Sequence, residues 1–249
     1  MVRQSGSCPG DVLHDDETLD ELRCGGLQLI QHGQGYRFSL DPVLLVAFAS
    51  LGKAQRILDL GCGCGVMALI AARRCPDAEV VGLEVQSQQA ERAQRNVTLN
   101  ALNAQVRIDC ADLRSWRDAR LFDCVLCNPP FRSVASGRVS SGDERSLSRH
   151  ECCGGLEDFL RCGAHLLGSG GTLALIHLAE RAVDVLTGMR RFGVEPKRMR
   201  WVHSRSGTSA RLVLVEGRRG GRPGLEVESP LSIYEGQEYS SEVAGYYDV

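Results

Sequence analysis

The 249-residue sequence lacks the features of a membrane or exported protein. It contains no uninterrupted apolar run of the ~20 residues that a membrane-spanning helix needs. The N-terminus has no signal-peptide pattern and carries an acidic run instead, with Asp11, Asp15, Asp16, Glu17, Asp20 and Glu21. We therefore expect a cytoplasmic protein that makes no membrane contact.

A second zinc-type cysteine pair is also missing. Eleven cysteines are present, but they lie in hydrophobic segments of a chain that is too large to need a disulfide framework. Cys124 and Cys127 form a C-x-x-C pair, and only the adjacent Cys152 and Cys153 follow, which fit one tetrahedral site poorly. We expect reduced thiols and no metal, with structural zinc as the alternative.

The sequence has no excess of basic residues, because its net charge is −2. The positive charges are nevertheless concentrated: eight basic residues and a single acid, Glu216, lie between Lys197 and Arg222. Two interpretations stay open. The segment forms a basic face for a nucleic acid, or its arginines are solvated and scattered over unrelated surfaces.

Hydrophobic content of 43% and charged content of 24% are typical of one globular α/β domain at this length. From residue 56 the apolar pattern alternates between strand and helix, which predicts βαβ units and a mostly parallel sheet with helices on both faces. The predicted strands are 56–59, 79–84, 105–109, 122–127, 172–177 and 210–216, and the predicted helices are 66–74, 86–102, 155–167 and 180–191.

The two ends of the chain differ from this pattern. Residues 1–24 are predicted to be a flexible acidic leader, and residues 25–217 the folded domain. That domain opens with two short strands, 27–31 and 35–38, and a helix over 43–49 that Ser39, Asp41 and Pro42 introduce. Residues 218–249, rich in Gly, Pro, Ser and charge, are predicted to be a C-terminal tail in loop conformation.

A glycine-rich turn follows the first strand of the domain, in the order Asp59-Leu-Gly-Cys-Gly-Cys-Gly65. Gly61, Gly63 and Gly65 let the backbone turn tightly and approach a ligand where a Cβ would collide. The spacing is G-x-G-x-G, and the Asp59 carboxylate would repel the pyrophosphate of a dinucleotide. A carboxylate there suits the amino group of a methionine moiety.

Two more carboxylates follow the next strands. Glu84 closes the second strand, where a carboxylate accepts hydrogen bonds from both ribose hydroxyls of an adenosine. Asp112 follows the third strand and can accept from the adenine amino group. Together with the glycine turn, these strand ends predict a site for a cofactor that contains adenosine.

The fourth strand ends in Asn128-Pro-Pro-Phe131, whose prolines fix the backbone direction. An amino group on an aromatic ring or a carbonyl is a poor nucleophile because its lone pair is delocalised. The side-chain oxygen of Asn128 and the carbonyl of Pro129 can hold both N–H groups and aim the lone pair at a methyl donor. Pro130 supplies rigidity, and Phe131 can stack on a planar substrate. The alternative is a plain turn after a buried strand.

D-L-G-C-G-x-G with N-P-P-F resembles class I S-adenosylmethionine-dependent methyltransferases that act on amino nitrogens. Gly35-Tyr-Arg-Phe-Ser-Leu-Asp41-Pro-Val, Ser136-Gly-Arg138, Arg149-His150-Glu151 and the Arg222-Pro-Gly tail are similar to the bacterial tRNA(Val) adenine-N6-methyltransferase family. The resemblance covers nearly the whole chain from about residue 25. It implies a Rossmann-like fold whose seventh strand is antiparallel.

The resemblance also implies a tRNA substrate, methylated on an adenine near the anticodon. We expect the protein to be a monomer. Its cofactor would be S-adenosyl-L-methionine, bound by Arg37, Phe38, Asp41, Asp59, Gly61, Cys62, Gly63, Gly65, Glu84, Asp112, Leu113 and Asn128. The substrate RNA would be bound by Arg132, Arg138, Arg149, His150, Arg218, Arg219 and Arg222.

Other functions are compatible with parts of the pattern. A protein-glutamine N5-methyltransferase needs the same two acceptors but usually carries an extra helical N-terminal domain. An rRNA guanine-N2 methyltransferase commonly duplicates the fold. An NAD-dependent oxidoreductase would have a different glycine spacing. A non-catalytic RNA-binding module has no use for the two aligned acceptors at Asn128 and Pro129.

Overall fold

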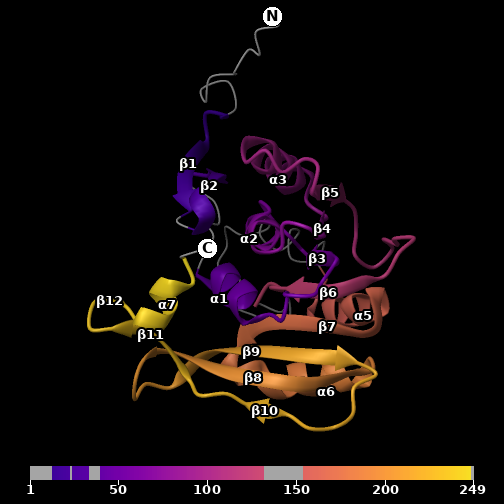
Figure 1. The fold of residues 1–249 in the computed structure, drawn as a ribbon, viewed down its shortest axis with the longest axis vertical. Helices are drawn as coiled ribbons and strands as arrows, with labels where there is room; N and C mark the ends of the chain where they lie inside the picture. Colours follow the sequence, from indigo (N-terminus) through magenta and orange to yellow (C-terminus); the bar gives the residue numbers. More distant parts are fainter. Residues whose placement is uncertain (1–12, 23, 34–39, 132–153, 248–249) are drawn as a thin grey trace, which may run out of the picture.

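The structure is a computed structural model that describes residues 13–22, 24–33, 40–131 and 154–247. A mostly parallel sheet forms its centre, as the strand–helix alternation predicts (Figure 1). Five adjacent strands of this sheet run parallel to one another: β3(Arg56–Leu60), β4(Glu79–Glu84), β5(Val106–Cys110), β6(Phe122–Cys127) and β7(Leu167–Leu178). Within the described ranges, no helix is both long and apolar enough to cross a membrane.

Among the described residues the sheet has ten strands. Their order is β12(Glu238–Tyr239)-β11(Leu231–Glu235)-β8-β9-β7-β6-β3-β4-β5, and β10(Glu226–Val227) pairs with β8. β9(Ala210–Arg219) lies antiparallel between β7 and β8(Val194–Arg205), which confirms the antiparallel seventh strand. The sequence did not predict β8. Its buried residues are Val194, Pro196, Met199 and Val202, which do not alternate strictly and are separated by Lys and Arg, so the segment lacks the period-two signal of a strand.

Helices cover both faces of the sheet. α1(Asp41–Phe48), α2(Val66–Arg74) and α3(Ser87–Leu99) pack on one face, and α5(Leu156–Leu166) and α6(Ala182–Arg191) pack on the other. The predicted helices are therefore confirmed, with ends shifted by up to three residues.

The two cysteines of the C-x-x-C pair point to opposite faces of the sheet. Three residues apart on a strand, Cys124 packs beneath α1 and α2, and Cys127 packs beneath α5. Burial raises the pKa of the Cys124 thiol to about 12. The two thiols therefore cannot bind the same metal ion. The alternative of structural zinc, which rested on this cysteine pair, loses its support.

The acidic leader is shorter than predicted, because β1(Glu17–Leu22) pairs antiparallel with β2(Leu27–His32) across the turn η2(Cys24–Gly26). The Glu17 carboxylate is buried between Arg92 and Arg95 of α3, at 2.7 Å from each. Hydrogen bonds from Arg95 lower its pKa to about 2. Glu17, an acidic residue of the predicted leader, thus attaches the β1–β2 hairpin to α3. The partner predicted for β2, residues 35–38, lies outside the described residues.

The C-terminal tail is folded rather than a loop. β10(Glu226–Val227), β11(Leu231–Glu235) and β12(Glu238–Tyr239) extend the sheet, and α7(Ser241–Gly245) packs beside β12 at the yellow end of Figure 1. Ion pairs link it to β8: Arg198 contacts Glu228 at 2.8 Å and Arg200 contacts Glu242 at 2.5 Å. These two members of the basic segment therefore have structural partners.

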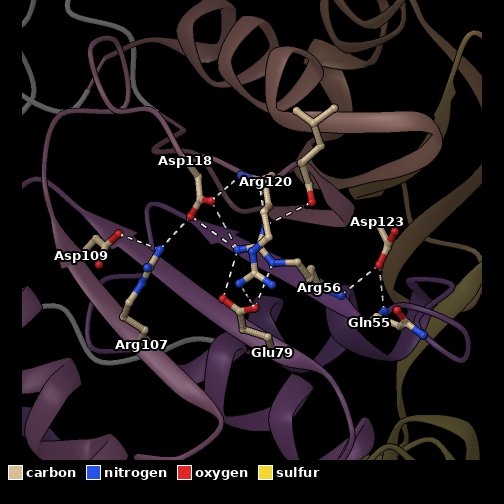
Figure 2. Close-up of polar contacts among 9 residues, drawn as sticks. Gln55, Arg56, Glu79, Arg107, Asp109, Asp118, Arg120 and Asp123 are labelled. Atoms are coloured by element: carbon tan, nitrogen blue, oxygen red, sulfur yellow. Dashed lines mark hydrogen bonds and ion pairs between the residues drawn. The ribbon is translucent and has the colours of Figure 1, made fainter.

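A buried arginine ties the starts of the central strands together (Figure 2). Arg56 contacts Glu79 at 3.0 Å and donates to the carbonyl oxygens of Arg120 and Leu121, at 2.7 and 3.1 Å. Its guanidinium also lies 4.4 Å from the centre of the Phe122 ring. Because the Arg56 side chain is buried and Glu79 only half-buried, loss of Glu79 would leave the buried guanidinium without this partner. The network therefore stabilises the amino edge of the sheet, and the carboxyl edge carries the predicted site.

Candidate active site

The register of the sheet brings three of the predicted residues into one row. Leu60 of β3 pairs with Cys127 of β6 on one side and with Leu83 of β4 on the other. The residues that follow are Asn128, Gly61 and Glu84, which therefore lie side by side at strand spacings of ~4.8 Å. The carboxyl ends of parallel strands thus gather the site that the sequence predicts.

The glycine turn is held tightly at this edge. The N–H groups of Gly61 and Cys62 donate to the carbonyl oxygen of Leu83 at 2.8 and 3.0 Å. Gly61 has φ of +78°, and a Cβ there would lie 2.8 Å from the Phe159 ring of α5. At Gly63, with φ of +55°, a Cβ would point into open space. Gly61 therefore serves packing, whereas Gly63 leaves its backbone open to a ligand.

Glu84 joins the turn to the second strand. One carboxylate oxygen accepts the N–H of Gly63 at 2.9 Å, and the other accepts the N–H of Gln86 at 2.9 Å. A carboxylate has about four acceptor positions, so two hydrogen bonds leave room for hydroxyl donors. Glu84 therefore positions the turn, a role that the sequence analysis missed, and keeps acceptor capacity for a ribose.

Asp59 is fully buried below the turn. Its Oδ2 accepts the N–H of Ala68 in α2 at 2.9 Å, while its Oδ1 has no hydrogen-bond partner within the described residues. Burial, reinforced by the charge of Glu84, raises its pKa to about 8. A buried carboxylate oxygen without a donor is costly, and a cationic ligand would satisfy it.

Two asparagines of α3 hold the N-terminal hairpin and were not predicted. Asn96 accepts from the N–H of Ile30 at 2.7 Å and donates to its carbonyl at 3.0 Å, and Asn100 makes the same pair of bonds with Gln28. Each asparagine side chain thus pairs with the backbone of β2 in the way that a neighbouring strand would. Asn96 also donates to the carbonyl oxygen of Cys64 in the glycine turn, at 2.9 Å. The only sequence signal is their spacing of four on one helix face.

We expect Asn96→Ala to weaken S-adenosylmethionine binding several-fold and to lower the free energy of unfolding by about 3 kcal/mol, because buried backbone groups lose their partners. Asn100→Ala is the matched control, since it releases Gln28 but not the glycine turn. Calorimetric titration and thermal melts of both variants check this. Equal losses of cofactor affinity in the two variants would contradict a role for Asn96 in the turn.

Asp112 lies past the end of β5 but already has a partner. The Arg114 side chain contacts its carboxylate at 2.6 and 3.0 Å, and this pairing lowers the Asp112 pKa. Contact with an adenine amino group would therefore share the carboxylate with Arg114. The neighbouring Leu113 is buried beneath α5 and forms an apolar wall.

The N-P-P-F turn continues directly from β6. The Asn128 side chain is half-buried, and neither its oxygen nor its NH₂ group forms a hydrogen bond within the described part of the chain. The Phe131 ring packs against His177 of β7, with ring centres 5.2 Å apart. Burial lowers the pKa of His177 to about 4, so its imidazole is neutral at pH 7. His177 thus supports the wall that Phe131 forms.

The remaining predicted residues are not brought into this row. Arg37, Phe38, Arg132, Arg138, Arg149 and His150 lie outside the described residues. Asp41 begins α1 and is half-buried. Arg218 pairs with Thr172 near the start of β7, ~13 Å along the strands from the row of Asn128, and Arg219 and Arg222 follow it at that amino edge. If these three bind RNA, they contact a part distant from the reacting base.

The cofactor that the sequence predicts fits these residues. The free Oδ1 of Asp59 matches the ammonium of a methionine moiety, and the open side of Gly63 gives its backbone access to a ligand. Glu84 retains acceptor positions for ribose hydroxyls, and Cys62 presents a neutral thiol because burial raises its pKa. The donors and acceptors needed for S-adenosylmethionine are therefore present at one sheet edge.

Comparison with known proteins gives the class. Residues 41–144 match the family model described as "Methyltransferase small domain". The crystal structure of protein Atu636 from Agrobacterium tumefaciens, titled a "predicted O-methyltransferase", superposes with a TM-score of 0.67 at 24% identity, over 84% of this chain and 95% of that one. That likeness shows the fold. The chain therefore has the fold of class I methyltransferases, a class whose cofactor is S-adenosylmethionine.

Curated relatives define the family. A tRNA1(Val) (adenine(37)-N6)-methyltransferase of Bacteroides thetaiotaomicron is 30% identical over 70% of this chain and 73% of its own length. The protein of the same name from Aliivibrio salmonicida is 32% identical over 57% of this chain, and the match spans 60% of its length, less than two thirds. This chain belongs to the tRNA1(Val) (adenine(37)-N6)-methyltransferase family.

Proposed function

We propose that this chain transfers the methyl group of S-adenosylmethionine to the exocyclic N6 of an adenine in tRNA. The observation that carries the proposal is the unpartnered amide of Asn128, which stands in one row with Gly61 and Glu84 of the cofactor edge in the described part of the chain. The names of the family members supply the nucleoside and the RNA class.

The chain contributes positioning and polarity rather than a covalent step. The cofactor, when bound, supplies an electrophilic methyl group. The side-chain oxygen of Asn128 and the carbonyl oxygen of Pro129 accept the two N–H groups of the substrate, which favours a nitrogen lone pair that points toward the cofactor edge. Phe131, braced by neutral His177, stacks on the ring of the flipped base.

Two rival substrates use the same acceptors. A guanine N2 or a glutamine amide also presents two N–H groups, and the geometry of Asn128 alone does not separate them from adenine N6. The names of the curated relatives favour adenine. We place the reaction in the cytoplasm, where tRNA is available, and propose a monomer as the acting form.

The test is to incubate the purified chain and radiolabelled S-adenosylmethionine with total bacterial tRNA, and in parallel with rRNA and a protein extract, followed by nucleoside mass spectrometry. We expect label in tRNA as N6-methyladenosine. Label in guanosine or in protein would contradict adenine in tRNA as the substrate, but it would agree with the role proposed for Asn128. Absence of label in all three pools would overturn the proposed function.

A further inference from the structure

Two adjoining clefts lie beside α5, away from the row of Asn128, Gly61 and Glu84. The first, of about 310 Å³, is bounded by α5 and by the segment after β5, which Figure 1 shows passing next to this helix. The second, of about 360 Å³, lies at the start of β7 and the end of β9. Arg219 lines both, so the two clefts adjoin at this side chain. We call the two clefts together the basic groove, after Arg117, Arg161, Lys197, Arg218, Arg219 and Arg222.

Most cations of the basic groove are not neutralised. Arg161 pairs with Asp158 at 2.5 Å. Arg117 instead donates to the carbonyl oxygen of Trp116 at 2.7 Å, and Arg218 donates to that of Gly170 at 3.1 Å. In the described part of the chain, neither guanidinium forms an ion pair with a carboxylate.

The same holds for the other groove cations. Arg219 donates to the carbonyl oxygens of Ala164, His165 and Leu167 at the end of α5, and Lys197 donates to that of Arg222 at 3.1 Å. Among the described residues, no carboxylate pairs with Arg219, Lys197 or Arg222. Neutral carbonyls thus fix the direction of these side chains without cancelling their charge. Arg198 and Arg200, on the same β8 strand as Lys197, are by contrast paired with acids.

The position of the groove connects it to the candidate active site. Its upper end is lined by Arg114, two residues past Asp112, and by Asp158 in the first turn of α5. It then follows α5 to Leu166, eight residues or ~12 Å further, and reaches the amino edge at Arg218. A groove of this length with several free cations suits a chain of anions better than a single phosphate.

We infer that the basic groove binds the phosphate backbone of the RNA whose base enters the site at Asn128. The inference rests on the proposed function for the identity of the RNA. Guanidinium groups held by backbone carbonyls keep further N–H donors for phosphate oxygens, and such contacts position a nucleic acid without reading its bases. The groove also explains how Arg218, Arg219 and Arg222, distant from the reacting base, contact the same substrate.

The test compares Arg117→Ala and Arg218→Ala, one in each of the two clefts, with Arg73→Ala as the matched control. Arg73 is an exposed arginine in the last turn of α2, on the opposite face of the sheet. The affinity for tRNA is measured by fluorescence anisotropy at several salt concentrations. Each groove variant should lose several-fold in affinity, and the slope of log affinity against log salt should fall by about 1. Affinity for S-adenosylmethionine, unchanged in all three variants, reports correct folding.

The outcomes separate the groove from the proposed function. If the groove variants have the same tRNA affinity and the same salt slope as Arg73→Ala, the basic groove does not bind RNA. This conclusion would hold even if the wild-type protein methylates tRNA. Displacement of tRNA by poly-glutamate at equal charge would overturn the assignment to RNA. Loss of tRNA affinity in the groove variants, together with methylation of a different RNA by the wild type, would support the groove and contradict the substrate.

Discussion

Replacing Asn128 by alanine is expected to lower the rate of methyl transfer at least 10²–10³-fold, the loss typical when a group that stabilises developing charge is removed. The reason is that the amide oxygen of Asn128 accepts an N–H of the substrate and keeps its lone pair directed. Because Asn128 has no hydrogen-bond partner among the described residues, its removal breaks no hydrogen bond within that part of the chain. The measurement is single-turnover methylation of tRNA, with calorimetric titration of S-adenosylmethionine alongside.

The matched control is Asn128→Asp, which keeps an acceptor oxygen in the same place and should retain more activity than Asn128→Ala. Cofactor affinity should stay within a few-fold of the wild type in both. A variant that loses cofactor affinity and transfer rate by the same factor would contradict the catalytic role. Equal activity of the alanine and aspartate variants would show that the acceptor is irrelevant.

Asp59→Asn is expected to weaken S-adenosylmethionine binding tenfold or more, without loss of thermal stability. The substitution preserves shape, and its oxygen can still accept the N–H of Ala68. Its NH₂ group, however, would face the ammonium of the cofactor in place of the free Oδ1. Calorimetric titration with S-adenosylmethionine measures the loss. Unchanged affinity would show that this carboxylate faces no cation.

The same carboxyl gives a pH dependence with a definite sign. The pKa of Asp59 is raised to about 8 by burial, and a cationic ligand favours the ionised form. Binding at pH 7 should therefore release a proton, and affinity should rise as pH rises toward 8. In the ligand-free protein, Asp59 of the unfolded chain ionises near the ordinary pKa of 3.8, so this group lowers stability as pH rises from about 4 to about 8.

Two measurements check this pH dependence. Titrations in buffers of different ionisation enthalpy reveal the released proton. Thermal melts at pH 6 and pH 8 should show a smaller pH-dependent loss of stability in Asp59→Asn than in the wild type. The same loss in both proteins would assign the titration to another group.

The central part of the fold follows from local patterns. Apolar runs separated by amphipathic segments predict the five parallel strands and the helices between them, and the glycine spacing places the first turn. The site residues Asp59, Glu84 and Asn128 lie at the ends of three of these strands. Because parallel strands share one carboxyl edge, the sequence alone is enough to bring them together.

The two ends of the chain were not predictable in this way. The strand Glu17–Leu22 is acidic and weakly apolar. It is held by hydrogen bonds between Glu17 and two arginines of α3, Arg92 and Arg95, which follow it by 75 and 78 residues in the sequence. The tail strands β10, β11 and β12 are short, and β10 and β11 depend on the edge of β8 for their hydrogen bonds. Propensity reports preferences of neighbouring residues, so it is insensitive to such distant partners.

The sequence by itself determined the class of fold, the cofactor and the order of residues at the reacting edge, because these depend on local periodicity and on turns that only glycine and proline support. Only the tertiary structure decided which arginines are free. Arg198 and Arg200 are neutralised by Glu216, Glu228 and Glu242, whereas Arg218 and Arg219 contact carbonyl oxygens. Charge pairing depends on distances in space, and residues adjacent in one basic segment reach different partners once the strands are aligned.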